Sequence, residues 1–202
     1  MKIGIFGGTF SPPHKGHFSA ASCFRETFSL DRLLIVPAAL PPNKAGIPIL
    51  DGEKRIEMCR LAFSEIPGCE ISPMELDRGG TSYTYLTLEA LSSPDDELYL
   101  LMGTDMFLTL GTWRRPDRIL SLATVVAAGR FSDPETRKAM EKTREDLLNS
   151  YKGKIVFLDN PIVEVSSTFL RDKIAAGEDT GEWLSDSVRE YIEKEKLYDD
   201  NR

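Results

Sequence analysis

The sequence predicts an α/β fold built on a mostly parallel sheet, with helices on both faces and a helical C-terminus. The first observation is that short apolar runs alternate with segments of helical periodicity, a pattern typical of parallel sheets. The second is that several of these runs are apolar throughout, as expected for strands covered on both faces. The third is that no internal repeat or linker divides the 202 residues, so we expect residues 1–202 to form one domain.

The elements of the first half start from one apolar run. Residues 2–6 (KIGIF) end at Gly7-Gly8, which predicts a buried strand followed by a tight loop. Pro12-Pro13 favours a helix that begins at His14 and ends near residue 28. The other elements predicted in this half are strand 32–37, a proline-rich loop 38–49, helix 51–65, strand 69–72 and helix 83–91 with Ser82 as its N-cap.

The second half continues the alternation. Its predicted elements are strands 98–102, 122–128 and 155–158, a charged helix 134–150, and helices 167–176 and 187–197. Ser187-x-x-Glu190 matches a capping box at the start of the last helix. Because ligands of such sheets bind at the carboxyl ends of the strands, we expect the functional residues just after strands.

The chain is acidic, with 25 Lys and Arg against 32 Asp and Glu and a net charge of −7. Nucleic acids and anionic membranes select basic faces, so we expect neither as a partner, whereas a small anionic ligand needs only a few local groups. Three cysteines, Cys23, Cys59 and Cys69, form no close pair and indicate reduced thiols. We find neither a signal peptide nor an apolar window of about 18 residues, so we expect a cytoplasmic protein.

The segment from Gly7 to His17 (GGTFSPPHKGH) follows a predicted strand and opens a predicted helix. Its two leading glycines let the backbone approach a ligand, and a helix N-terminus offers free N–H groups and a positive dipole end, which together favour a phosphate. His14 and His17 are the only histidines of the chain and share one helix face at i, i+3 spacing. Gly16 between them leaves room for a nucleotide.

Three other interpretations compete for this segment. The glycines could form only a turn, and the histidines could be surface residues or zinc ligands. Zinc needs further ligands, and the chain has no other histidine and no Cys-x-x-Cys pair, so we expect no protein metal site. The loop matches neither the G-x-G-x-x-G fingerprint nor a P-loop.

A second polar segment follows the last predicted strand, at residues 166–171 (SSTFLR). Ser166, Ser167 and Thr168 at a helix start can cap the helix and donate to an anion. Arg171, one turn further, can reach the same anion with its fork of donors. The alternative is an ordinary capped helix with a solvated arginine.

Together the two segments resemble the two signatures of the nucleotidyltransferase α/β superfamily, (H/T)xGH and SSTxxR. The resemblance implies a Rossmann-like fold and transfer of a nucleotidyl group to a phosphate-bearing acceptor. It implies that His14, His17 and Arg171 are catalytic, the histidines at the α-phosphate and the second motif at the β- and γ-phosphates. The matching residues are Gly7, Gly8, Thr9, Phe10, Pro12, His14, Gly16 and His17 in the first motif, and Ser166, Ser167, Thr168 and Arg171 in the second.

Features in the middle of the chain narrow the resemblance to the bacterial nicotinate-nucleotide adenylyltransferases. They are Pro41-Pro42-Asn43-Lys44, Ser82-Tyr83-Thr84, and Gly103-x-Asp105 with Trp113 beyond it. The similarity covers nearly the whole chain, down to residues 188–192 (VREYI). It implies transfer of AMP from ATP to nicotinate mononucleotide with release of pyrophosphate, a step of NAD biosynthesis, with Mg²⁺ carried by the ATP.

The resemblance also divides the residues between the two substrates. ATP is assigned to the two motifs together with Gly103 and Asp105, whose carboxylate suits ribose hydroxyls. The acceptor is assigned to Tyr83, Thr84, Trp113 and Lys44. The helix start at Tyr83 and Thr84 would receive the carboxylate, Trp113 would stack on the pyridine ring, and Lys44 would contact the phosphate. The alternatives are a core role for Trp113 and a solvated loop charge for Lys44.

Three residues depart from the family pattern. Ser11 stands where Asp or Asn is usual, Asn43 where His is usual, and Leu86 where Asp is usual. None is a histidine or arginine of the two motifs, so the departures concern loop geometry and acceptor affinity. Two other functions stay open: a related transferase that uses nicotinamide mononucleotide or phosphopantetheine, and a non-catalytic nucleotide-binding module.

Overall fold

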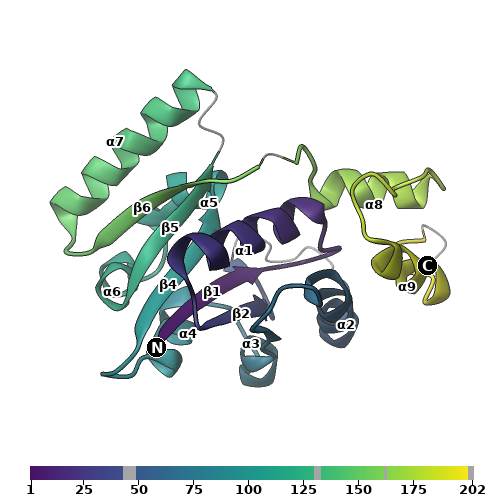
Figure 1. Cartoon of the computed structure of the whole chain (residues 1–202), viewed down its shortest axis with the longest axis horizontal. Helices are drawn as coiled ribbons and strands as arrows, with labels where there is room; N and C mark the ends of the chain where they lie inside the picture. Colours follow the sequence, from purple (N-terminus) through teal and green to yellow (C-terminus); the bar gives the residue numbers. More distant parts are fainter. Residues whose placement is uncertain (43–48, 130–132, 162, 200–202) are drawn as a thin grey trace.

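Six parallel strands form the sheet in the computed structural model, which describes residues 1–42, 49–129, 133–161 and 163–199. The strand order is β3-β2-β1-β4-β5-β6 (Figure 1). Every neighbouring pair is parallel, which confirms the predicted fold class. The strands are β1 (Lys2–Gly8), β2 (Arg32–Pro37), β3 (Cys69–Ile71), β4 (Glu97–Gly103), β5 (Ala123–Gly129) and β6 (Lys154–Asp159).

Helices occupy both faces of this sheet and one of its ends (Figure 1). They are α1 (Lys15–Phe28), α2 (Gly52–Phe63), α3 (Met74–Arg78), α4 (Thr84–Leu91), α5 (Thr104–Leu108), the 3₁₀ turn η2 (Leu110–Thr112), α6 (Pro116–Leu122), α7 (Pro134–Ser150), α8 (Ser167–Ala175) and α9 (Asp186–Lys194).

Strand side chains alternate between two apolar cores, because successive residues of a strand point to opposite faces. Ile3 and Ile5 of β1, with Leu34 of β2, belong to a core that α4 to α7 complete. Phe6 and Leu33 belong to the other core, which α1 and α2 cover. Burial on both faces explains why these strands are apolar throughout.

The chain reverses its direction across the sheet at the centre. From β1 it proceeds to β2 and β3 on one side, then returns to β4 on the other side of β1 and continues to β6. Such a switch point opens a crevice at the carboxyl ends of the two central strands. Gly8 ends β1 and Gly103 ends β4, so the first motif and the Gly103-x-Asp105 segment both start at this crevice.

A third core joins the C-terminal helices to α2. Leu170 of α8 packs with Val188 and Ile192 of α9, and Met58 of α2 lies in the same cluster. Figure 1 shows α8 and α9 beyond the carboxyl end of β1, on the side of the molecule away from the N-terminus. This core therefore holds the second motif next to the first.

Among the boundaries of the N-terminal half that differ from the prediction, those of β1 and α4 bear on the site. Strand β1 continues through Gly7 and Gly8, which are in register with Val36 and Pro37 instead of forming a loop. Ser82 does not cap α4: Tyr83 is the N-cap, with no side-chain bond to the helix. The Ser82 hydroxyl instead accepts a hydrogen bond from a backbone N–H of the loop after β2 at 2.8 Å.

The predicted capping box of the last helix is wrong. Helix α9 starts at Asp186 with Ser185 as its N-cap, and the Ser185 side chain makes no capping hydrogen bond to the helix backbone. The Ser187 hydroxyl bonds to the hydroxyl of Ser185 at 3.2 Å. Helices α3, α5 and α6 were not predicted, because five to seven residues are too few for a helical period to emerge.

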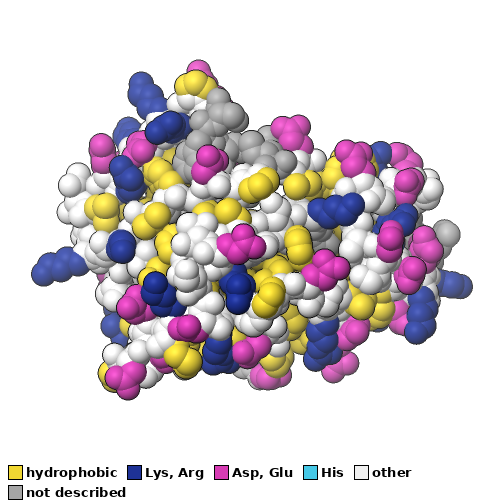
Figure 2. All heavy atoms as spheres, in the orientation of Figure 1, with side chains coloured by type: hydrophobic (Ala, Val, Ile, Leu, Met, Phe, Trp, Pro, Cys, Tyr) yellow, Lys and Arg dark blue, Asp and Glu magenta, His cyan; other side chains and the backbone are white. Residues whose placement is uncertain are grey.

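The described helices include none that is long and apolar enough to cross a bilayer. On the face drawn in Figure 2, acidic and basic side chains are interspersed, with apolar side chains between them.

Candidate active site

His14 and His17 cap the first turn of α1 for each other. Nδ1 of His14, the N-cap, accepts from the His17 backbone N–H at 3.3 Å. Nδ1 of His17 accepts from the His14 backbone N–H at 3.2 Å. This is the reciprocal geometry of a capping box, made here by two imidazoles. The rings stack with their centroids 3.7 Å apart, so the structure brings the two predicted histidines together.

These bonds fix the protonation state of both rings. A nitrogen that accepts from an N–H carries no proton, so each neutral ring has its proton on Nε2. Burial lowers the pKa of His14 to about 4. Burial, and then the charge of His14, lower the pKa of His17 well below its ordinary value. At neutral pH each ring therefore has an uncharged Nε2–H donor.

Phe10 shapes the loop between β1 and α1. Its backbone has the left-handed φ of 50°, which a non-glycine residue adopts only when its surroundings hold it there. The buried ring packs edge-on against His17 at 5.1 Å and against Phe63 at 5.8 Å. A Cβ on Gly8 would lie 2.9 Å from Cζ of Phe10, so this ring position requires glycine there.

Gly16 makes room for a protein group. A Cβ on Gly16 would lie 3.1 Å from Nδ1 of His14 and 3.4 Å from Cγ1 of Val165. The first contact would disturb the imidazole cap and the second would push on the segment before α8. The expected room for a nucleotide at Gly16 stays a prediction.

Two serines begin the second motif and have different tasks. Ser166 is the N-cap of α8, and its hydroxyl accepts from the Phe169 backbone N–H at 3.2 Å. The Ser167 hydroxyl donates to the carbonyl of Pro12 at 2.9 Å. Ser166 therefore caps α8, and Ser167 connects this helix to the loop after β1.

Arg171 makes a second connection between the two motifs. Its Nη1 donates to the carbonyl of Ser11 at 2.9 Å, across 160 residues of sequence. Its Nη2 donates to the hydroxyl of Thr168 at 3.1 Å. The two motifs thus meet in one surface region, whose N–H, hydroxyl and guanidinium groups are of the kinds that suit an anion.

Arg55 of α2 supports this surface from inside the molecule, and the sequence analysis did not single it out. The residue is only 2% exposed. Its Nη1 donates to the carbonyl of Thr9 at 3.0 Å and its Nε to the carbonyl of Leu50 at 2.8 Å. Burial lowers its pKa, yet a guanidinium stays charged at neutral pH. A positive charge therefore lies behind the loop.

Gly103 and Asp105 lie where the switch point places them. Gly103 ends β4 and is the N-cap of α5, and Asp105 is in the first turn. Both residues are exposed, and no heavy atom lies within 4 Å of a Cβ added to Gly103. The carboxylate is therefore exposed just beyond the carboxyl end of β4.

Tyr83 and Trp113, assigned to the acceptor, are joined through a residue that the sequence analysis missed. The Arg114 guanidinium lies over the Tyr83 ring, 4.9 Å from its centroid. The neighbouring Trp113 is partly buried against a core of the sheet, and its Nε1 donates to the Thr109 hydroxyl at 3.2 Å. Thr84 is the first residue of α4. Lys44 and Asn43 lie outside the described residues.

The start of α4 is held from two directions. On one side, Leu40 pairs with Thr81 in an isolated β-bridge. On the other, the buried Thr87 hydroxyl donates to Glu75 of α3 at 2.5 Å, and Arg78 contacts both side chains. The position of Tyr83 is therefore set by α3 and by the loop after β2.

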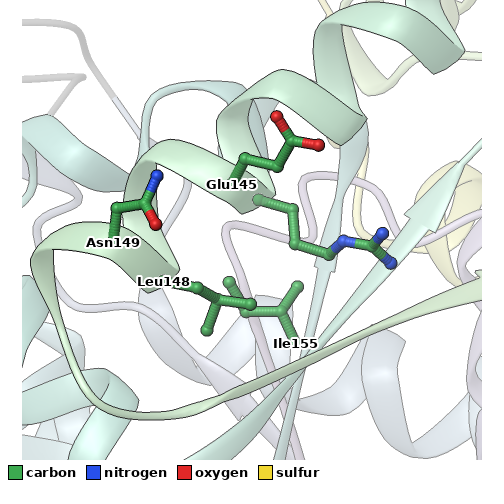
Figure 3. Close-up of a pocket in the computed structure, with 5 residues that line it drawn as sticks. Glu145, Leu148, Asn149 and Ile155 are labelled. Atoms are coloured by element: carbon green, nitrogen blue, oxygen red, sulfur yellow. The ribbon is translucent and has the colours of Figure 1, made fainter.

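A cleft of about 460 Å³ lies elsewhere, between α7 and β6 (Figure 3). Leu148 and Ile155 face each other across it, while Glu145 and Asn149 extend from the α7 side. None of the motif residues lines it. Among the residues that the structure describes, no group of three or more His, Cys, Asp or Glu side chains could hold a metal ion.

Comparison with known proteins identifies the family. The cytidylyltransferase-like family model matches residues 5–173. A Thermus thermophilus protein named "Probable nicotinate-nucleotide adenylyltransferase" is 39% identical over 98% of this chain and 100% of its own length. The chain belongs to this family of adenylyltransferases. A Citrifermentans bemidjiense member with the same name is 35% identical over 100% of both chains.

Solved structures support the fold assignment of this adenylyltransferase. A Plasmodium falciparum nicotinic acid mononucleotide adenylyltransferase complexed with APC has a TM-score of 0.73 at 16% identity, over 98% of this chain and 96% of that one. The same protein complexed with NaAD has a TM-score of 0.73 at 17% identity, over 98% and 97%. At such low identity these neighbours show the Rossmann-like fold of the adenylyltransferase, which agrees with the predicted sheet.

Proposed function

We propose that this chain transfers AMP from ATP to nicotinate mononucleotide, giving nicotinate adenine dinucleotide and pyrophosphate in NAD biosynthesis. The membership of the family supports this reaction class. The observation that links this reaction to particular residues is the contact between the two motifs. There Arg171 donates to Ser11 and Ser167 donates to Pro12. That contact supports the proposal that the imidazole, hydroxyl and guanidinium groups of the two motifs act on one triphosphate.

In the proposed reaction the 5′-phosphate oxygen of the acceptor attacks the α-phosphorus of ATP in line. The new P–O bond forms as the bond to the bridging oxygen breaks, and pyrophosphate leaves. The Nε2–H groups of His14 and His17 donate to the oxygens that gain charge, and Arg171, with Ser166, Ser167 and Thr168, holds the departing phosphates. Catalysis then rests on positioning and charge stabilisation, with no covalent enzyme intermediate.

The remaining contacts to ATP in this proposal involve its triphosphate and its ribose. Gly7, Gly8, Thr9, Phe10 and Gly16 form the wall against which the triphosphate lies. Asp105, exposed after Gly103, accepts hydrogen bonds from ribose hydroxyls, the usual role of a carboxylate at this place in such sheets.

The acceptor lies on the α4 side of the crevice. The backbone N–H groups at Tyr83 and Thr84 receive the nicotinate carboxylate at the positive end of α4, and Trp113 stacks on the pyridine ring. Lys44 contacts the acceptor phosphate in this proposal. Arg114, which lies over Tyr83, adds positive charge beside the acceptor.

Mg²⁺ enters this proposal with ATP, held by phosphate oxygens and water. The N–H and guanidinium groups of the two motifs fit phosphate oxygens, since neither group ligates a cation. When bound, the ion neutralises charge on the triphosphate. We also propose a cytoplasmic location, supported by the free Cys23, Cys59 and Cys69 thiols.

A pyrophosphate-release assay with ATP and a panel of acceptors tests the function. We expect rapid release with nicotinate mononucleotide, slow release with nicotinamide mononucleotide and none with phosphopantetheine. Faster release with either of the other acceptors reassigns the substrate. Absence of release with every acceptor, in a preparation that binds ATP, would indicate a nucleotide-binding module.

A further inference from the structure

The hydroxyl of Tyr198 reaches the loop of the first motif from the far end of the chain. It lies 3.0 Å from the hydroxyl of Ser11, across 187 residues of sequence. Ser11 is only 6% exposed. The same residue gives its carbonyl to Arg171 at 2.9 Å. Ser11 is therefore the point where the C-terminal segment and the second motif meet the first.

The backbone places Tyr198 there at a conformational cost. Lys196 and Tyr198 both have left-handed φ values, 50° and 68°, on either side of the buried Leu197. Such conformations persist when the surrounding contacts hold them. Here the contacts are the packing of Leu197 in the α8–α9 core and the bond from Tyr198 to Ser11.

The chemistry of the phenol suits a neutral hydrogen bond. Burial raises the pKa of Tyr198 to about 12, although the hydrogen bond with Ser11 and then the charges of Arg171 and Arg55 oppose the rise. The phenol is therefore protonated at neutral pH. It can donate to Ser11, or accept from Ser11 while it donates to the sulfur of Met58 at 4.0 Å. Either arrangement fixes the Ser11 side chain.

We propose that Tyr198 is a positioning residue for ATP: its bond to Ser11 holds the loop so that Arg171 keeps its place for the β- and γ-phosphates. This inference rests on the proposed function for the role of Arg171. Tyr198 does not itself touch the reacting atoms.

Tyr198→Phe tests the proposal, because it removes one hydroxyl and keeps the ring. We expect a three- to tenfold rise in the KM for ATP and in its calorimetric Kd, the range for losing one neutral hydrogen bond. The KM for nicotinate mononucleotide should stay unchanged. Tyr191→Phe is the matched control, since Tyr191 packs in the same core and has no hydrogen bond to the loop among the described residues.

The double variant with Ser11→Ala tests the route through Ser11. If the two hydroxyls act as a pair, the ATP affinity of the double variant should equal that of the weaker single variant. The route through Ser11 is overturned if the fold-losses of ATP affinity in the two single variants multiply in the double variant. It is also overturned if folded Tyr198→Phe binds ATP as well as the wild type does. The pyrophosphate-release assay on the wild-type protein tests the proposed function, and calorimetric titration with ATP tests the role of Tyr198. The two hypotheses can therefore fail separately, because ATP binding is still measurable if no pyrophosphate is released.

Discussion

The Arg171 guanidinium and the Ser11 carbonyl lie 2.9 Å apart although 160 residues separate them in sequence. The bond joins the helix after the last strand to the loop after the first. The bond therefore depends on the tertiary fold and not on local sequence.

Arg171→Lys should weaken the use of ATP and of pyrophosphate in the reverse reaction. Lysine keeps the charge but cannot hold Ser11 and Thr168 with one fork. Loss of a charged hydrogen bond costs about 1.5–3 kcal/mol, which predicts an approximately 10- to 100-fold rise in the KM for ATP. Calorimetric titration should show nearly unchanged acceptor binding. Arg189→Lys, in an ion pair with Asp186 on α9, is the control. A loss confined to the acceptor would contradict the assignment.

His17→Ala should lower kcat by about 10²–10³, comparable to losing one oxyanion donor. It also removes half of the imidazole cap, which by itself costs about 0.5–2 kcal/mol of stability. His17→Glu separates the two effects, because a glutamate at this helix position restores the cap but has no N–H to donate. We expect the thermal melt of the glutamate variant to recover while kcat stays low. Recovery of kcat together with stability would reduce His17 to a structural role.

The two histidines should stay uncharged well below neutral pH. Nitrogen-15 NMR is simple here because the chain has only two histidines. We expect both rings in the Nε2–H form at pH 7, with the His14 midpoint at about pH 4. An imidazolium signal near pH 6.5 would show that the cap does not form in solution.

The lowered histidine pKa should also make stability depend on pH. In the unfolded chain histidine titrates near its ordinary value of about 6.5, so between pH 6.5 and 4 the unfolded state binds more protons. Stability should therefore fall as the pH drops through this window. His14→Asn keeps an N-cap without a titrating ring, and urea melts should show a smaller decrease for it. An equal decrease in both proteins would place the loss elsewhere.

Trp113→Ala should weaken nicotinate and nicotinamide mononucleotides by similar factors. Both carry a cationic ring, and a cation–π contact of about 0.5–2 kcal/mol does not distinguish acid from amide. In the proposed site the start of α4 distinguishes them, because an amide would leave the N–H donors there unpaired at about 1–3 kcal/mol. We expect at least about a tenfold preference in kcat/KM for the acid in the wild type. Trp113→Phe should retain most of the affinity. A preference that disappears only in Trp113→Ala would make Trp113 the residue that reads the carboxylate.

The strands of the sheet could be predicted from the sequence more completely than the contacts of the candidate site. Strands such as 32–37 were predicted with their observed bounds, because burial on both faces leaves a continuous apolar run. The two motifs were predicted as segments, but their contact was not. Arg55 bonds to a loop residue that lies 46 positions away in the sequence, and Tyr198 bonds to one that lies 187 positions away. Such contacts leave no local pattern, because an arginine in an amphipathic helix normally indicates its solvated face.

The imidazole cap would limit the affinity of the proposed site for pyrophosphate, because it keeps both rings uncharged. Pyrophosphate is multiply charged, and two imidazolium ions in its path would act as an electrostatic trap. Because Nδ1 of each ring is occupied by a backbone N–H, the rings offer only dipoles. In the proposed reaction, the diphosphate would dissociate from a site that recognises it without strong Coulomb attraction from the histidines. Turnover would then lose little time to product escape.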